Sequence, residues 1–285
     1  MSTDRPIVVG IDGTMEARDA ARWSAAEAMR RGAPVLLLHA MVPGDYAGTS
    51  HKKPEKLASD WLEQAAADVR AVWPGAPVSA RLCDGPAEAE LVHQSTHAAL
   101  VVIGTRGFGR PLESLTDSPA ITIARHVECP LVTVPHDRPA PPDGAVVVGV
   151  DGSSVSEQAT GFAFEEAKLR HCPLVAVHTW SDVALEDDHA VARRVGSWQR
   201  IREEEKLLLA DRLAGWQRKY PDVHVLRVVT QDRPVRSLLE HAAGAQLLVV
   251  GSRGRGGYEG MLLGSTSQAL LYSCPCPLAV VRHTR

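Results

Sequence analysis

The chain carries two copies of one structural unit. The segment Ile-Val-Val-Gly-Ile-Asp-Gly at residues 7–13 recurs as Val-Val-Val-Gly-Val-Asp-Gly at residues 146–152. Later landmarks recur with the same mutual spacing: Gly104, Gly107 and Cys129 in the first copy, and Gly251, Gly254 and Cys276 in the second. An internal repeat of this kind predicts two domains of one fold, and 285 residues suffice for two domains of ordinary size.

A proline-rich stretch separates the two copies. Residues 136–143, His-Asp-Arg-Pro-Ala-Pro-Pro-Asp, lack any apolar period and are typical of a semi-rigid linker. We therefore predict one domain at residues 1–135 and a second at residues 144–285.

Each copy alternates short apolar runs with helical patterns. Runs rich in Val, Leu and Ile are typical of strands in a sheet covered on both faces. Amphipathic patterns lie between them, for example at 16–31 and 200–219. The alternation predicts an α/β fold, with a five-stranded, parallel, doubly wound sheet and helices on both faces in each half. The ten predicted strands are 7–11, 35–39, 78–82, 99–103, 131–134, 145–150, 174–178, 223–229, 246–250 and 278–281.

The composition is that of a globular protein, with 45% hydrophobic and 23% charged residues. A formal charge of −3 gives no electrostatic reason to expect a nucleic acid or an acidic membrane as partner. No apolar run approaches the about 20 residues that span a bilayer, and Asp4 and Arg5 stand where a signal peptide would be apolar. We expect a cytoplasmic protein.

The five cysteines are scattered and include no C-x-x-C pair. They are Cys83, Cys129, Cys172, Cys274 and Cys276. Neither a disulfide framework nor a zinc site is indicated, and we expect buried free thiols.

A glycine-rich segment follows the apolar run 246–250. Gly251, Gly254 and Gly264 fit a G-x2-G-x9-G-[S/T] spacing that ends at Ser265. Glycines let the backbone approach an anion closely, and Ser265 offers an N–H and a hydroxyl at the start of a helix. The spacing is neither that of a Walker loop nor that of a G-x-G-x-x-G fingerprint. The segment predicts a phosphate-binding loop, and an ordinary surface turn is the alternative interpretation.

Polar residues follow other strand ends, where ligands bind in doubly wound sheets. Asp12 and Asp151 directly follow the first strands. Each either caps a helix or forms a turn, or holds Mg²⁺ through water or a ribose hydroxyl, and the two roles are compatible. His39 and His178 end the second strands, and we interpret both as hydrogen-bonded structural residues.

Positive charge is concentrated near the glycine-rich segment of the second copy. Arg253 and Arg255 flank Gly254, and Arg233 follows the third strand, where the first copy has Gly85. The Gly-Pro and Arg-Pro loops after the third strands form either turns or the wall of a nucleotide pocket.

Together, the strand-Gly-x-Asp-Gly starts and the loop 251–265 resemble the universal stress protein family, in its tandem two-domain form, over nearly the whole chain. The resemblance implies two Rossmann-like domains of the adenine nucleotide alpha hydrolase-like type that bind ATP. In that family the loop holds phosphates, the first-strand Asp lies near ribose and metal, and the end of the second strand meets adenine. For the second copy it implies ATP contacts at Gly149, Asp151, Thr179, Arg233, Gly251, Arg253, Gly254, Arg255, Gly256, Gly264, Ser265, Thr266 and Ser267, with Asp151 reaching Mg²⁺ through water. Weaker contacts are implied in the first copy at Gly10, Asp12, Ala40, Gly85, Gly104, Arg106, Gly107, Gly109 and Ser118.

The first copy departs from the loop motif at the position of the third glycine. Asp117 stands there, followed by Ser118 and Pro119. A carboxylate repels phosphate, and proline removes a backbone N–H from the anion site. Partly screened repulsion at a few Å is on the order of 1 to 4 kcal/mol, so we predict tighter ATP binding in the second half.

The resemblance implies a regulator or sensor in stress response or growth arrest, in which nucleotide shifts the population of a conformation that binds a regulatory protein. No nucleophile elbow, H-E-x-x-H motif or kinase signature is present in the sequence, so we expect no enzyme beyond a slow ATPase. Two alternatives stay open: a nucleotidyl or adenylyl transferase of a related fold, and a scaffold that does not depend on nucleotide.

The last strands of the two copies, within 129–135 and 274–281, are apolar and lie at a sheet edge by chain order. An unpaired edge invites a partner strand. We predict that the halves pair through these strands as a pseudo-symmetric dimer within the chain, as members of the resembling family do between protomers. We also expect a homodimer of chains.

Overall fold

A computed structural model describes residues 5–42, 54–105, 118–138, 141, 143–180, 191–254 and 261–282, with the backbone alone for 191–198. The chain divides into two compact units. One comprises Met1–Pro139 together with Pro277–Arg285, and the other comprises Ala140–Cys276.

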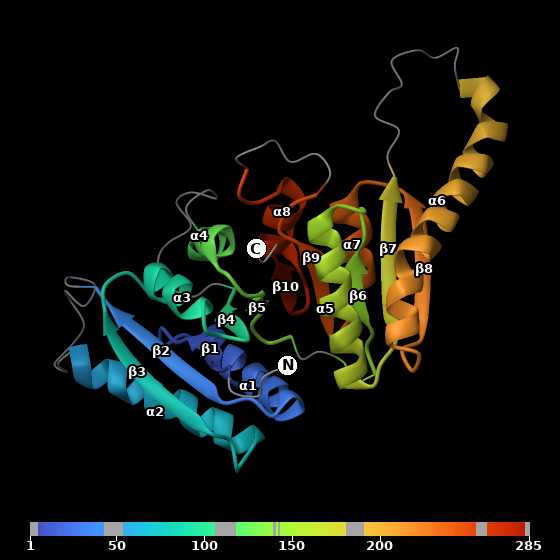
Figure 1. Cartoon of the computed structure of the whole chain (residues 1–285). Helices are drawn as coiled ribbons and strands as arrows, with labels where there is room; N and C mark the ends of the chain where they lie inside the picture. Colours follow the sequence, from blue (N-terminus) through green and yellow to red (C-terminus); the bar gives the residue numbers. More distant parts are fainter. Residues whose placement is uncertain are drawn as a thin grey trace. The chain divides into compact units, whose positions relative to one another are not determined.

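The first unit is built on a parallel sheet in the order β3-β2-β1-β4-β5. Helices α1 and α2 cover one face, and α3 and α4 cover the other (Figure 1). The strands are β1 (Ile7–Gly10), β2 (Val35–Met41), β3 (Val78–Asp84), β4 (Leu100–Gly104) and β5 (Leu131–Val134). The helices are α1 (Met15–Arg31), α2 (Pro54–Val72), α3 (Ala87–Ser95) and α4 (Pro119–His126).

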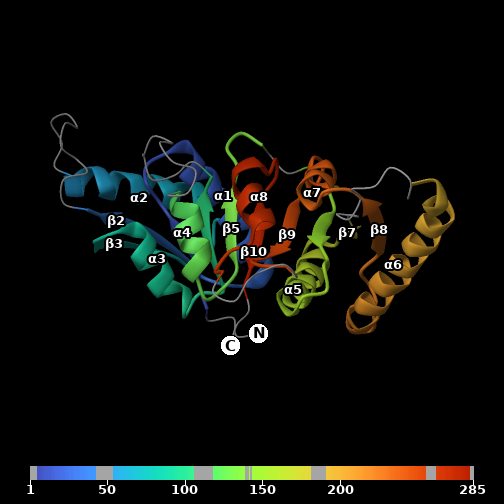
Figure 2. The same ribbon diagram turned by 90° about the horizontal axis from the view of Figure 1, so that it is seen from above.

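The second unit repeats this arrangement, with parallel strands in the order β9-β6-β7-β8. Helices α5 and α6 lie on one face and α7 and α8 on the other (Figure 2). The strands are β6 (Val146–Gly149), β7 (Leu174–Trp180), β8 (Val225–Gln231) and β9 (Leu247–Gly251). The helices are α5 (Ser154–Arg170), α6 (Val191–Lys219), α7 (Pro234–Ala242) and α8 (Ser265–Ser273). The predicted α/β fold with parallel sheets is confirmed.

The final strand β10 (Leu278–Val281) pairs antiparallel with β5. Leu278 lies opposite Thr133, and Val280 lies opposite Leu131. The predicted pairing of these two strands is confirmed. By its contacts β10 belongs to the first unit, although it closes the second copy in the chain.

The central strands are buried because helices cover both faces. Every residue of β1, β4 and β5 is buried, as their continuously apolar sequences predict. Polar residues then determine where the helices begin. The hydroxyls of Thr14 and Ser153 accept hydrogen bonds from the backbone N–H groups of Ala17 and Ser156, and so cap α1 and α5. The first turns therefore lie directly after β1 and β6.

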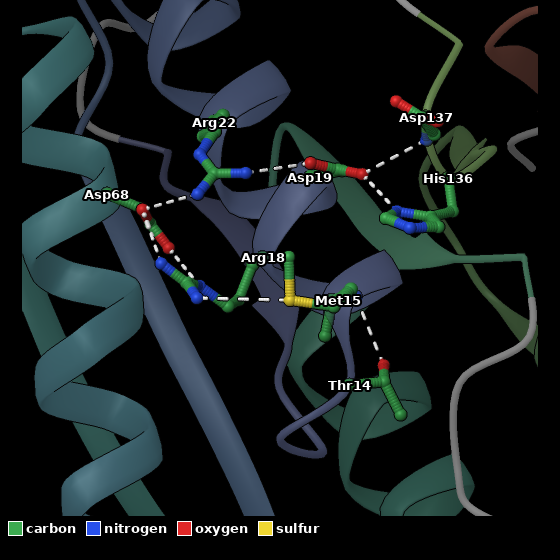
Figure 3. Close-up of polar contacts among 9 residues, drawn as sticks. Thr14, Met15, Arg18, Asp19, Arg22, Asp68, His136 and Asp137 are labelled. Atoms are coloured by element: carbon green, nitrogen blue, oxygen red, sulfur yellow. Dashed lines mark hydrogen bonds and ion pairs between the residues drawn. The ribbon is translucent and has the colours of Figure 1, made fainter.

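A charged cluster connects α1 to α2 in the first unit (Figure 3). Asp68 of α2 accepts hydrogen bonds from Arg18 and Arg22 of α1, at 2.7 Å and 2.8 Å. On the other side of α1, His136 Nδ1 lies 2.7 Å from Asp19 Oδ2 (Figure 3). The first residue of the predicted linker is thus held against a helix.

No described helix has both the length and the apolar character that a membrane span requires.

Candidate functional site

A cavity of about 320 Å³ opens in the second unit at the carboxyl ends of β6, β7 and β9. Ligands bind at this edge of doubly wound sheets, and the volume falls in the range of small-molecule sites. The lining contains ten of the residues predicted from the sequence: Gly149, Asp151, Thr179, Gly251, Arg253, Gly254, Gly264, Ser265, Thr266 and Ser267. The chain therefore brings together residues that are more than a hundred positions apart in the sequence.

The two arms of the glycine-rich segment are joined at one carbonyl oxygen. Ser252 O accepts hydrogen bonds from Gly264 N at 2.7 Å and from Ser267 Oγ at 2.9 Å. Ser252 and Ser267 are both buried, with exposed fractions of 1% and 2%. These bonds fix the start of α8 beside the end of β9.

The glycines of the loop let its backbone approach neighbouring groups closely. A Cβ atom on Gly254 would collide with Oδ2 of Asp151. A Cβ atom on Gly251 would lie 3.1 Å from a methyl carbon of Val155 and 3.3 Å from the backbone nitrogen of Ser156. The backbone of the loop therefore approaches both the first-strand carboxylate and the start of α5.

Helix α8 directs its N-terminus into the cavity. Gly264 precedes its first turn and has no side chain to cap it, while Ser265, Thr266 and Ser267 line the cavity. The N–H groups of a first turn carry partial positive charge and bind anions. Arg253 adds a formal positive charge to the lining. The site thus favours an anion.

Asp151 forms a turn and at the same time faces the loop. Its Oδ1 accepts a hydrogen bond of 2.9 Å from Ser153 N. Its Oδ2 is the carboxylate oxygen nearest Gly254. The predicted turn-forming role is confirmed, whereas the N-cap of α5 is Ser153 and not Asp151.

His178 is a structural residue, as predicted. Its Nδ1 donates a hydrogen bond of 2.6 Å to the carbonyl oxygen of Val150, and its Nε2 lies 2.8 Å from Glu205 Oε2 of α6. The His39 ring makes the matching 2.6 Å bond to Ile11 O in the first unit, but its edge meets Trp61 there. Both histidines fix the loop after the first strand to the end of the second strand.

The apolar wall of the cavity was not found from the sequence. It is formed by Val150, Val177, Leu238, Val250 and Met261. Leu238 lies on the strongly amphipathic helix α7. The sequence shows that it belongs to the apolar face of this helix, but not that this face borders a cavity. An apolar surface beside an anion site suits a ligand with a flat, weakly polar ring.

Arg233 is not brought into the cavity. It is exposed and precedes α7, and its neighbour Pro234 lines the cavity instead. The Arg-Pro loop was interpreted either as a turn or as a wall of the pocket. Pro234 forms part of the cavity wall, and Arg233 is not among the described lining residues.

In the first unit the equivalent residues lie at the same sheet edge. Gly10 ends β1, Ala40 lies near the end of β2, and Gly104 ends β4. Asp12 forms a turn, since its Oδ1 accepts a 3.0 Å bond from Thr14 N, and Gly85 follows β3 with a φ of 112° that favours glycine.

The start of α4 differs from the start of α8. Ser118 precedes α4 without a side-chain cap bond, and Pro119 is the first helical residue. Ala120 occupies the position of Ser267, so this helix has no hydroxyl at the position from which Ser267 bonds to the residue after β9. Five residues of the predicted sites lie outside the described residues: Arg106, Gly107, Gly109, Arg255 and Gly256. Asp117, which replaces the third loop glycine, lies outside them as well.

Asp151 is the carboxylate among the described residues that line the cavity. The described residues contain no group of three His, Cys, Asp or Glu side chains that could hold a metal ion. Mg²⁺ commonly binds proteins through one or two carboxylates, with phosphate oxygens and water completing its octahedron. Asp151 beside an anion site fits that mode of binding.

Comparison with known proteins agrees with the sequence resemblance. The profile of the universal stress protein family matches residues 4–135 and 144–282. A universal stress protein of Mycobacterium tuberculosis strain H37Rv is 39% identical over 98% of this chain and 96% of its own length. One of Mycolicibacterium smegmatis is also 39% identical, over 99% and 98% of the two chains. The crystal structure of a universal stress protein from Archaeoglobus fulgidus has the same fold, with a TM-score of 0.71 at 17% identity over 98% of this chain and 96% of that one.

Proposed function

Since the chain belongs to the universal stress protein family, we propose that its second copy binds ATP and that nucleotide occupancy regulates the protein in stress response or growth arrest. The observation that carries the proposal is the cavity in the second unit. It combines an uncapped helix N-terminus, close-approach glycines, one arginine, one carboxylate and an apolar wall. These are the groups that a nucleotide requires.

Each part of the nucleotide has a matching part of the cavity. The phosphates bind at Gly254, at the first turn of α8 and at Arg253. Asp151 holds the ribose or, through water, Mg²⁺, whose charge offsets that of the phosphates. The adenine lies against Val177 and Leu238 and meets the backbone of Thr179 at the end of β7.

We infer that the protein is a binding protein whose turnover is slow. Among the described residues of the cavity lining, Asp151 and Arg253 are the ionisable ones. Phosphoryl transfer is fast when a positioned base orients the attacking group and several charges stabilise the leaving oxygen. The single carboxylate also holds the metal or the ribose, so we expect bound ATP to be hydrolysed slowly. The nucleotide then stays bound long enough for its occupancy to act as a signal.

We further infer that the two copies bind ATP unequally. Asp117 replaces the third loop glycine, Pro119 replaces a residue with an N–H, and Ala120 replaces the hydroxyl of Ser267. All three changes weaken an anion site. The first copy then serves mainly as a structural or partner-binding half.

The first test is to purify the full chain without added nucleotide, denature it and quantify the adenine nucleotide that is released. About one ATP per chain is expected from one tight site. Calorimetric titration of nucleotide-free protein with Mg-ATP then compares Asp151→Ala with Asp12→Ala. The Asp151 variant is expected to lose the tight site and the Asp12 variant to retain it.

Equal loss of ATP affinity in the two variants would contradict the inference that the two copies bind ATP unequally. No measurable ATP binding by the nucleotide-free wild type would favour a scaffold that does not need nucleotide. Light scattering with and without ATP tests the proposed homodimer and whether nucleotide alters it.

A further inference from the structure

Two cysteines meet at the end of α8. The helix ends at Ser273 and is followed by Cys274-Pro275-Cys276. The two Sγ atoms are 3.8 Å apart, and neither cysteine is in a disulfide. Cys274 is half-buried, whereas Cys276 is buried with an exposed fraction of 5%. Cys274 is thus the more exposed residue of the pair, and its sulfur contacts that of the buried one.

The backbone anchors the segment that carries the two thiols. Cys274 is non-helical, with φ −63° and ψ 127°, and the chain bends at Pro275 and Cys276. Pro275 fixes its own φ and disfavours a helical conformation at Cys274. The N–H of Cys274 also bonds to Leu270 O and so ties the segment to the last turn of α8. The two cysteines therefore lie on a short, anchored bend, where their sulfur atoms are in contact.

We propose that Cys274 and Cys276 are a redox-active dithiol that forms a reversible intramolecular disulfide by exchange with a low-molecular-weight disulfide. In the first step the Cys274 thiolate attacks a disulfide RS–SR, forming a mixed disulfide and releasing RS⁻, which takes up the proton that Cys274 lost. In the second step Cys276 attacks Cys274 Sγ, loses its proton and expels a second RS⁻. The two thiols lose two electrons and two protons, and RS–SR becomes two RSH.

The environment of the thiols determines this order. The hydrogen bond with Cys274 and burial both raise the pKa of the Cys276 thiol well above its ordinary value. A buried, protonated thiol does not attack a dissolved disulfide. It reacts once the mixed disulfide has formed on its neighbour, because the reacting sulfur is then adjacent. A disulfide requires about 2.05 Å between sulfurs, so a small rotation of the partly exposed Cys274 side chain closes the bond.

The first copy provides an internal comparison. Val127 stands at the position of Cys274, so Cys129 lacks the partner that Cys276 has. Cys129 is buried, and burial raises its pKa to about 12. The dithiol thus belongs to the second copy alone, and the proposal does not depend on nucleotide binding.

Peptide mapping of the full chain tests the proposal directly. Trypsin releases Cys274 and Cys276 together in the peptide 256–282, and each other cysteine falls in a peptide of its own. Reduced protein is incubated with glutathione disulfide, denatured, alkylated with iodoacetamide and digested. The expected 256–282 peptide carries no alkyl group, is lighter by two hydrogen atoms, and gains two alkyl groups after dithiothreitol. The peptides of Cys83, Cys129 and Cys172 are expected to be alkylated.

Two serine variants separate the steps. Cys276→Ser is expected to retain glutathione on Cys274, because the second step is lost. Cys274→Ser is expected to leave Cys276 unmodified, and Cys172→Ser is the control that leaves the disulfide unchanged. The proposal is overturned if wild-type Cys274 and Cys276 are alkylated as fully as Cys172, or if Cys274 keeps glutathione in the wild type. The wild-type result needs no variant to fold.

Discussion

The hydroxyl of Ser267 donates a 2.9 Å hydrogen bond to the carbonyl oxygen of Ser252. It thereby ties the first turn of α8 to the residue that follows β9, across the glycine-rich segment. The same carbonyl oxygen accepts from Gly264 N. The base of the loop is thus held closed by hydrogen bonds within the chain, which limits the ordering that binding requires.

Removing this hydroxyl is expected to loosen the loop. Ser267→Ala loses a buried hydrogen bond, which costs about 1–2 kcal/mol of unfolding free energy. ATP must then restore the closed loop, so its affinity is expected to fall by about five- to thirtyfold. Chemical denaturation and calorimetric titration measure the two effects. Ser273→Ala on the same helix is the control, because its exposed hydroxyl bonds to Ala269 O within the helix.

The contact between Gly254 and Asp151 gives a second prediction. In Gly254→Ala the new methyl group would collide with Oδ2 of Asp151 and push the carboxylate aside. Because Asp151 is half-buried and can rotate, we expect the free energy of unfolding to change by less than about 1 kcal/mol. The displaced carboxylate is expected to lower the affinity for Mg-ATP about tenfold or more.

Gly215→Ala is the matched control for this substitution. A Cβ atom there meets no described atom within 4 Å, and the residue lies inside α6. It is expected to raise stability by about 0.5–1 kcal/mol without changing affinity. Equal affinity of Gly254→Ala and wild type would show that Asp151 does not act at the nucleotide.

The strand ends of the site could be predicted because buried parallel strands have a strong sequence pattern. Ten residues that the family resemblance implies, at strand ends and in the glycine-rich segment, line one cavity. Leu238 and Met261 could not be predicted as lining residues. Leu238 lines the cavity because of how α7 packs on the sheet, and Met261 because of where the chain lies before α8. No local pattern encodes those long-range contacts.

Three other features could be identified only from the structure. Strand β10 follows an apolar pattern that indicates a sheet edge, but its antiparallel pairing with β5 depends on which edges meet. The contact of Cys274 with Cys276 depends on how the chain bends after α8, and a search for C-x-x-C spacing does not detect it. Likewise α6 begins at Val191 rather than near residue 200, in a stretch without a clear apolar period.

The Asp68 cluster predicts loss of stability in acid. Burial raises the pKa of Asp68, but hydrogen bonds from Arg18 and Arg22 outweigh it and hold the pKa below its ordinary 3.8. A depressed pKa stabilises the fold above pH 3.8, and this stability is lost as pH falls through the folded-state pKa.

Asp68→Asn tests this dependence. The substitution is expected to cost about 1–2 kcal/mol at pH 7, since the arginines are partly exposed, and progressively less below about pH 4. Urea unfolding at a series of pH values measures the difference. Glu63→Gln, an exposed position of the same helix, is expected to change little. A cost that is independent of pH would show that the charge of Asp68 does not matter.

The contact of His136 with Asp19 of α1 predicts a pH dependence of stability opposite to that of the Asp68 cluster. The hydrogen bond with Asp19 raises the pKa of His136 above its ordinary 6.5. A raised pKa adds stability that is fully present below pH 6.5 and is lost as pH rises through the folded-state pKa. His136→Gln is therefore expected to be less stable than wild type at about pH 6 and equal to it at about pH 9, as measured by thermal unfolding. His126→Gln, an exposed histidine bonded within its own helix, should show no such difference. If the His136 variant differed from wild type equally at both pH values, the contact would act through packing and not through charge.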